Sequence, residues 1–362
     1  MEEITRPTIM EVDLNNLEYN INQIQNYVGS NVKLMPVIKA SGYGTYINKR
    51  LDILNMFDIV AVACVDEAVE IRHLGYDKEI FVLNQPYVTE IEKIIKYNIA
   101  VGISSKDFAI ALGEHKEQVI VHIEVGTGMG RTGIHPDRVK SFLQVLPNNT
   151  KIEGIYTHFS SADSDDEYTK KQIVSFNRAV QSIEEEIGNV KYVHAAASNA
   201  ILNYPETHFN LVRPGIILYG YPASDTTFEK INLKPIAKLK SKITFLKEVE
   251  EGTSIGYNRS YVTNRHTKVA TVPIGYADGF RRTFSNGGKV LVNGMEATII
   301  GKVCMDGFML DVTDILDVKL GDDVYIWDND KIKLEDLAKA CDTINYEILS
   351  TVGVRVPRVF IK

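Results

Sequence analysis

The chain has 362 residues, of which 44% are hydrophobic and 24% charged, and its net charge is −7. This is the composition of an ordinary folded protein, and the length predicts two domains, or one barrel with a smaller domain. The acidic balance without a basic stripe argues against nucleic acid as a partner, and no apolar run reaches the ~18 residues of a membrane span.

Eight short apolar runs alternate with amphipathic segments between Met1 and about Lys234. In chain order they are LMPVIK, DIVAVA, EIFVLN, IAVGIS, VIVHIEV, EGIYTHF, KYVHAA and GIILYG. They are rich in Val and Ile and mostly lack polar alternation, as parallel strands buried on both faces do. Segments between them, such as VDEAVEIRHLG and KKQIVSFNRAVQSIEEEIG, read as helices that end at a glycine. The pattern predicts an α/β fold, a TIM-like (β/α)8 barrel over residues 1–234, with a doubly wound open sheet as the alternative.

The pattern of apolar and turn-forming residues changes after about Pro235. Short strand-like runs with turn signals between them follow, and VNGME and WDNDK resemble hairpin turns. We therefore expect a smaller, mainly-β C-terminal domain over residues 235–362.

Polar side chains stand where the predicted barrel strands end. In chain order they are Lys39 and Tyr43, Glu124 and the Arg131 of GTGMGR, His158, and Ser198; Arg213 and Gly215, in VRPG, directly precede the eighth run. Each has an ordinary structural explanation when taken alone, such as a solvated lysine or a glycine required by a turn. Chemistry in such barrels collects at the C-terminal ends of the strands, so the set as a whole indicates one site.

A single cofactor would account for this set. A lysine amine forms a Schiff base with a carbonyl compound, and pyridoxal 5′-phosphate is the common case. Barrel phosphate sites often follow the last two strands, where this chain has Ser198 and the backbone of Gly215 and Ile216. Three scattered cysteines, Cys64, Cys304 and Cys341, lack zinc spacing and predict buried thiols in a reducing compartment, the cytoplasm; we expect no metal. The N-terminus has no signal-peptide pattern either.

Seven ordered blocks resemble the alanine racemase family of barrel-type pyridoxal phosphate enzymes. They are VIKASGYG, GTGMGRTG, THFSSAD, RPGIILYG, PIGYADGF, GKVCMDGF and TINYEILS, and they extend over essentially the whole chain. The resemblance implies a racemase that supplies D-alanine for peptidoglycan. It also implies a homodimer whose active sites use residues from both subunits, with no membrane segment.

The resemblance assigns roles residue by residue. Lys39 and Tyr257 would be the two acid–base groups, with the tyrosine supplied by the partner subunit. Cofactor contacts would come from Lys39, Tyr43, His158, Ser198, Arg213, Gly215, Ile216 and Tyr346. Arg131 and the backbone of Met305 would hold the substrate carboxylate, and Tyr276 and Arg282 would line the substrate entrance.

Four positions depart from the family pattern. Glu124 stands where the family usually has a carbamylated lysine, and it keeps the negative charge that could pair with Arg131. Gly126 replaces an aspartate, Ala197 an asparagine and Thr45 a histidine. We expect Glu124 to point inward, close to Arg131, and the enzyme to work without carbon dioxide.

Three other functions are alternatives to alanine racemisation. A serine racemase, like the catalytic half of vancomycin-resistance enzymes, stays open because of Glu124 and Ala197, although the bulky Tyr346 favours alanine. A decarboxylase would need an acidic partner for the pyridine nitrogen, where this chain has Arg213. A non-catalytic cofactor carrier would lack Tyr257 and the whole β region.

Overall fold

Residues 5–362 are described by a computed structural model, in which the chain divides into two units. We call Leu17–Gly42 with Tyr46–Lys234 the barrel unit; the β unit is the chain up to Asn16 with Tyr43–Thr45 and Pro235–Lys362. The domain boundaries expected from the sequence, 1–234 and 235–362, stay a prediction, and the two units differ from them in both short N-terminal segments.

Parallel strands form the centre of the barrel unit. Six of them make one sheet in the order β3-β4-β5-β6-β7-β8, and β2 pairs with β9. Their bounds are β2 Lys33–Leu34, β3 Ile59–Val62, β4 Glu79–Val82, β5 Ala100–Ile103, β6 Val119–Glu124, β7 Thr150–Tyr156, β8 Tyr192–His194 and β9 Leu211–Val212. The four-residue strands β3 and β5 are buried along their whole length, in agreement with their continuous apolar sequence.

Single parallel bridges close this sheet into a ring. Val37 pairs with Ala61 at one seam, and Ala197 pairs with Arg213 at the other. With the β2–β9 pair between them, eight strands make the predicted (β/α)8 barrel.

The eighth strand is not the one predicted from the sequence. GIILYG was expected to supply it, but Ile216–Tyr219 forms a 3₁₀ helix, η5, and the strand is β9 before it. Burial explains the error, because all four residues of η5 are buried as a strand would be. Arg213 and Gly215 consequently follow the last strand instead of preceding it.

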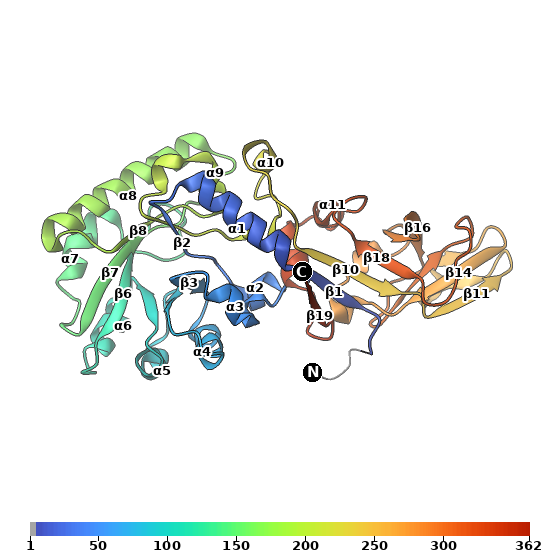
Figure 1. Cartoon of the computed structure of the whole chain (residues 1–362), viewed down its shortest axis with the longest axis horizontal. Helices are drawn as coiled ribbons and strands as arrows, with labels where there is room; N and C mark the ends of the chain where they lie inside the picture. The colour runs from blue at the N-terminus through green and yellow to red at the C-terminus, as the bar shows by residue number, and fades with distance from the viewer. Residues whose placement is uncertain (1–4) are drawn as a thin grey trace. The chain divides into compact units, whose positions relative to one another are not determined.

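Helices lie on the outer side of these strands (Figure 1). The two helices expected from their terminal glycines are confirmed as α4, Val65–His73, and α8, Asp166–Ile187. The others are α1 Leu14–Val28, α3 Leu51–Leu54, α5 Ile91–Lys96, α6 Lys106–Leu112, α7 Val139–Leu143, α9 Ser198–Asn203 and α10 Thr227–Lys230. In the described part of the chain, no helix is both long and apolar enough to cross a membrane.

The β unit contains a nine-stranded sheet in the order β11-β14-β17-β16-β15-β18-β10-β1-β19. Its strands are β1 Ile9–Asp13, β10 Ala237–Lys242, β11 Phe245–Val249, β14 Thr267–Val272, β15 Lys289–Val292, β16 Met295–Ile300, β17 Phe308–Asp311, β18 Asp323–Trp327 and β19 Arg358–Ile361. A separate pair, β12 Ser254–Ile255 and β13 Tyr261–Val262, and helices α11 Leu334–Ala340 and α12 Asn345–Ser350 complete the unit. The mainly-β C-terminal domain predicted from the sequence is therefore confirmed.

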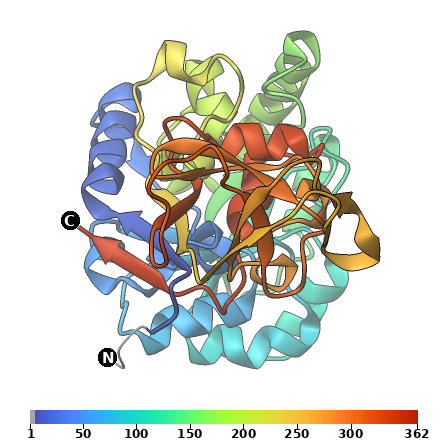
Figure 2. The ribbon, with the colours of Figure 1, turned by 90° about the vertical axis from the view of Figure 1, so that its right-hand side faces the viewer.

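The strand β1 comes from the N-terminus and was not expected in this sheet. It pairs antiparallel with β10 and parallel with β19, the red arrow that ends at the C-terminus in Figure 2. Its residues alternate in burial, and Met10 and Val12 are fully buried. The VNGME turn is a hairpin as predicted, with Asn293 and Gly294 both at positive φ between β15 and β16.

Candidate active site

Lys39 follows the first barrel strand and opens a left-handed turn. Ala40, Ser41 and Gly42 have φ values of 52°, 55° and 61°, all in the left-handed region. Such a conformation costs a non-glycine residue roughly 1–2 kcal/mol. Strain of this kind persists at functional sites when the surroundings hold it in place.

The Glu67 carboxylate holds this turn. One oxygen accepts a hydrogen bond from Ala40 N–H at 2.6 Å, and the other accepts from Ala63 N–H at 2.8 Å. Glu67 lies in the first turn of α4, so it ties the helix to the ends of two neighbouring strands. This role of Glu67 could not be predicted from the sequence, because an acidic residue in a first helical turn is common.

Four cationic or basic side chains of the barrel unit lie close enough to affect one another. Burial lowers the pKa of Lys39, and the nearby positive charges of Arg131 and Arg213 lower it further. Burial and the charges of Arg213, Arg131 and Lys39 lower the pKa of His158 to about 3. The site therefore combines an amine that loses its proton readily with a neutral imidazole.

Arg213 is 2% exposed, and neutral groups hold its guanidinium. The two terminal nitrogens donate to the backbone oxygens of Thr157, His194 and Ala195 at 2.7–3.0 Å, and to His194 Nδ1 at 3.0 Å. A longer contact of 3.4 Å reaches His158 Nδ1. Nε makes no hydrogen bond within residues 5–362 and is not among the fully buried unpartnered atoms, so its N–H is accessible to a ligand.

Ser198 and Gly215 join the loops that follow the last two strands. Ser198 is the first residue of α9, and its Oγ accepts a hydrogen bond from Gly215 N–H at 3.0 Å. Ile216 follows, fully buried, at the start of η5. The hydroxyl group of Ser198 can still donate its own proton to a ligand.

Glu124 points inward, as expected, but does not form the expected ion pair. It is 3% exposed; Oε1 accepts a hydrogen bond from Thr132 Oγ1 at 2.6 Å, and Oε2 has no partner in the described chain. Burial raises the pKa of Glu124. Arg131 is exposed and forms no ion pair with Glu124. Both side chains nevertheless line one small cavity together with His158.

The predicted acid–base group Tyr257 meets the two predicted entrance residues in the β unit. Tyr257, Tyr276 and Arg282 line a surface hollow of ≈ 400 Å³. Tyr257 is 63% exposed and precedes two left-handed residues, Asn258 with φ 58° and Arg259 with φ 51°. An exposed phenol on a constrained turn is well placed to serve a second molecule.

The turn of Tyr276 is bound to the loop that carries Met305. Tyr276 N–H donates to Cys304 O at 3.1 Å, and Ala277 N–H donates to Met305 O at 3.0 Å. A Cβ atom on Gly275 would collide with both of these carbonyl groups, which explains the glycine.

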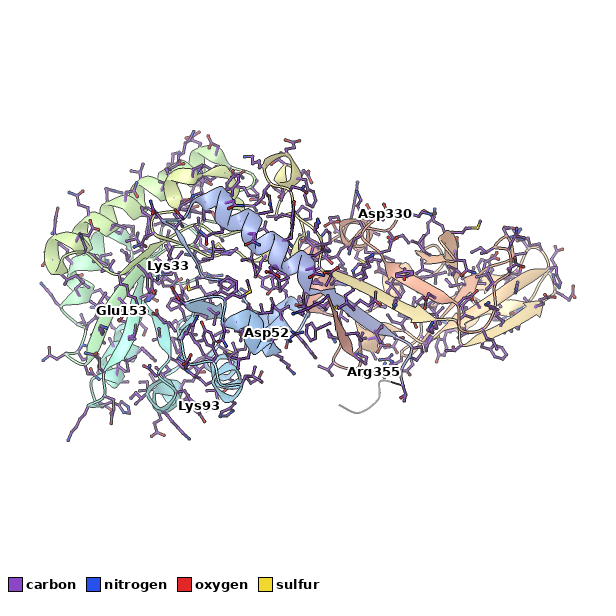
Figure 3. All side chains as sticks on the ribbon, viewed as in Figure 1. Lys33, Asp52, Lys93, Glu153, Asp330 and Arg355 are labelled. Atoms are coloured by element: carbon purple, nitrogen blue, oxygen red, sulfur yellow. The ribbon has the colours of Figure 1, made fainter. Side chains whose placement is uncertain are left out.

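The buried carboxylate of Asp278 holds the turn of Gly275 and Tyr276 in place. It is fully buried and accepts hydrogen bonds from Gly275 N–H at 3.0 Å and Arg355 Nε at 3.1 Å, and it pairs with Arg6 at 2.7 Å. Arg355, labelled in Figure 3, also pairs with Asp306 beside Met305. Asp278 lies inside the quoted PIGYADGF block, but its anchoring role depends on distant arginines and could not be read from the sequence.

Tyr43 and Tyr346 also come together in the β unit. Their ring centroids are 6.1 Å apart, and burial raises the pKa of Tyr43. The predicted residues thus form two sets. Lys39, Arg131, His158, Ser198, Arg213, Gly215 and Ile216 belong to the barrel unit, and Tyr43, Tyr257, Tyr276, Arg282, Met305 and Tyr346 to the β unit.

The barrel set can bind an aldehyde and an aromatic nitrogen. An amine with a lowered pKa attacks a carbonyl carbon more readily than an ordinary lysine. A buried guanidinium N–H donates a hydrogen bond and cannot realistically give up its proton. The exposed phenol of Tyr257 offers an acid–base group in the β unit.

Two family models match most of the chain. The model described as alanine racemase, N-terminal domain, matches residues 12–223, and the model described as alanine racemase, C-terminal domain, matches residues 236–360. Among curated proteins, the alanine racemase of Halothermothrix orenii is 41% identical over 369 residues, which cover 99% of this chain and 97% of that protein.

Solved structures agree with these matches. The alanine racemase of Clostridium difficile 630 has a TM-score of 0.95 at 35% identity, over 99% of this chain and 97% of that one. The alanine racemase of Bacillus anthracis with bound L-Ala-P has a TM-score of 0.93 at 34% identity, over 99% and 96% of the two chains.

Proposed function

Because the chain belongs to the alanine racemase family, we propose that its interconversion of L- and D-alanine uses pyridoxal phosphate bound at Lys39. The relatives and solved structures above are alanine racemases, which favours alanine over serine as the substrate. We further propose that the enzyme supplies D-alanine for peptidoglycan. A cytoplasmic location is consistent with three cysteines that are all free thiols, although their expected burial is wrong: Cys64 is exposed, and Cys304 and Cys341 are partly exposed.

The free Nε–H of Arg213 is the observation that carries the cofactor proposal. It belongs to a residue that is 2% exposed and has no acceptor in the described chain, and an unprotonated ring nitrogen is an acceptor that fits it. The Ser198 hydroxyl group, hydrogen-bonded to Gly215, lies where barrel enzymes often hold a phosphate. The residues present therefore fit the cofactor. Its remaining contacts would come from Tyr43, His158, Gly215, Ile216 and Tyr346.

When bound, pyridoxal phosphate withdraws electrons from the substrate and makes its Cα proton acidic. Lys39 removes or returns this proton on one face of Cα, and Tyr257 of the partner subunit does so on the other. Arg131 and the Met305 backbone orient the substrate carboxylate. Arg213 donates a hydrogen bond while keeping its own proton, which limits electron withdrawal and favours return of the proton to Cα.

The proposed assembly is a homodimer in which each site draws on both subunits. The exposure of Tyr257, Tyr276 and Met305, at 63%, 44% and 52%, supports it, since these side chains are available to a second copy. Aromatic and methionine side chains are typical of protein interfaces.

The proposal is tested with purified protein, L-alanine and L-serine, and chiral separation of the products. We expect alanine to racemise at least about 10-fold faster than serine, because an added hydroxyl must be accommodated in a pocket built for a methyl group. Activity should disappear on removing pyridoxal phosphate and return on adding it. Faster racemisation of serine, or full activity without the cofactor, would contradict the proposal.

Glu124→Gln should lower the turnover of alanine by about 10-fold, with little change in the melting temperature. The charge that attracts Arg131 is lost, so this arginine orients the substrate carboxylate less well. Stability should change little, because Oε2 has no hydrogen bond to lose. Turnover is measured at saturating alanine, with the exposed Glu117→Gln as the control.

Bicarbonate distinguishes the carboxylate from a carbamate. The wild-type enzyme should not respond to it, whereas Glu124→Lys should gain activity when bicarbonate is added. Full turnover in Glu124→Gln would show that this charge has no part in the mechanism.

A further inference from the structure

The interior of the barrel is unusually polar between β4 and β8. Barrel interiors are mostly filled by Val, Ile and Leu in layers drawn from alternate strands. Here Phe81 on β4, His122 on β6 and His194 on β8 form one such layer, and all three are fully buried. The Phe81 and His122 rings stack with centroids 4.3 Å apart, and Tyr156 stacks on His194 at 5.0 Å.

Hydrogen bonds connect this layer to Arg213. Arg213 NH1 lies 3.0 Å from His194 Nδ1, and His194 Nε2 lies 2.8 Å from His122 Nδ1. A guanidinium only donates, so His194 Nδ1 must accept and the ring proton must be on Nε2. That proton is donated to His122 Nδ1, so His122 in turn carries its proton on Nε2.

The last proton of this series points at a carboxylate. His122 Nε2 lies 3.7 Å from Glu79 Oε1, and in the described chain neither atom has a hydrogen-bond partner. The other Glu79 oxygen pairs with Lys191 at 2.8 Å, and Lys191 also pairs with Glu153, which is labelled in Figure 3. All the donors from Arg213 to Glu79 therefore point the same way.

The sequence makes room for this series. A Cβ atom on Gly154 would lie 2.6 Å from His122 Nδ1, and one on Gly102 would collide with the Tyr156 hydroxyl group. Burial lowers the pKa of both His122 and His194, so both rings are neutral in the folded protein. An apolar layer would fill the same space without buried polar atoms that each need a partner.

We infer that His194 and His122 are positioning residues for Arg213, held in their Nε2–H tautomers and oriented by Glu79. They fix the guanidinium so that its terminal nitrogens are occupied and Nε–H is left for the cofactor. The link to the cofactor rests on the proposed function of Arg213. The series of hydrogen bonds from Arg213 to His122 does not depend on that proposed function.

The tautomers are tested first, in cofactor-free wild-type protein labelled with ¹⁵N-histidine. Long-range ¹H–¹⁵N spectra, assigned with His122→Leu and His194→Leu, should show both rings neutral with the proton on Nε2. An Nδ1–H tautomer or an imidazolium for either ring would overturn the inference. A failure to bind pyridoxal phosphate would count against the proposed function and leave this measurement intact.

The second test asks whether the series acts on Arg213. His194→Asn places an amide oxygen near the position of Nδ1, whereas His194→Leu removes the acceptor. With cofactor added, we expect His194→Leu to shift the absorption maximum of the bound cofactor and lower kcat about 10-fold with KM nearly unchanged, and His194→Asn to restore both. His208→Leu removes another buried histidine, bonded to Ile201 O at 2.8 Å and remote from this series, and should change neither.

A purely structural role would give a different result. The two His194 variants would then lose stability without a change in the absorption maximum, and the asparagine would not restore kcat. If His194→Leu does not fold, two measurements still test the inference: the effect of His122→Leu and the histidine tautomers of the wild-type protein. Either can show that the series of hydrogen bonds is absent.

Discussion

Lys39→Ala should lower the rate of alanine racemisation by about 10³-fold or more. The substitution removes both the amine that anchors the cofactor and one of the two acid–base groups, and acid–base catalysis alone typically contributes ~10²–10⁴-fold. The rate is measured by chiral separation in both directions, at saturating pyridoxal phosphate. We expect both directions to be lost, because each requires Lys39 as acid or base.

The matched control is Lys33→Ala, since Lys33 lies on β2, the strand that precedes Lys39, and is labelled in Figure 3. Lys33 is exposed and pairs with Asp58 at 2.9 Å, an interaction that contributes little to stability. Borohydride reduction of the wild-type enzyme, followed by peptide mapping, should place the cofactor on Lys39 alone. A label on another lysine, or near-normal activity in Lys39→Ala, would refute the assignment.

Tyr257→Phe should lower the rate by ~10²–10⁴-fold, because it removes the phenolic proton of the second acid–base group and leaves the ring in place. Mixing Tyr257→Phe with Lys39→Ala tests whether the tyrosine acts on the partner subunit. Random exchange makes half of the dimers hybrids, and each hybrid has one intact site of two. About a quarter of the wild-type activity should therefore return.

Subunit exchange has to be shown independently, for example with two affinity tags. Tyr87→Phe, at an exposed tyrosine of the barrel unit, serves as the control and should leave activity unchanged. Proven exchange without any recovery would mean that Tyr257 acts within its own chain.

Sequence pattern was enough to predict most of the barrel, since buried parallel strands are continuous apolar runs and the helices between them end at glycines. It failed at the eighth strand, where β9 has two residues and a longer apolar run follows as a 3₁₀ helix. The strand β9 and the 3₁₀ helix are equally buried, so hydrophobicity could not distinguish one from the other. It also missed β1, because pairing of the two chain ends leaves no local signal.

The residues proposed to take part in the chemistry could be predicted from their places near the strand ends and from a family resemblance, whereas the residues that position them could not. Glu67 and Asp278 act through backbone N–H groups and distant arginines that only the fold brings near. His122 and His194 did carry a signal, since a histidine in the middle of a buried parallel strand needs a polar partner inside the barrel. Their sequence could indicate such a partner but could not identify it as Arg213.

The position of β1 between β10 and β19 has a consequence for synthesis on the ribosome. More than 200 residues separate β1 from β10, so at ~5–20 residues per second the strand waits roughly 10–40 s for its first partner. During that time Met10 and Val12, fully buried in the finished sheet, have no strand beside them. The barrel strands emerge meanwhile and can pair as they appear. The nine-stranded sheet of the β unit is complete only once β19, at the end of the chain, has left the ribosome.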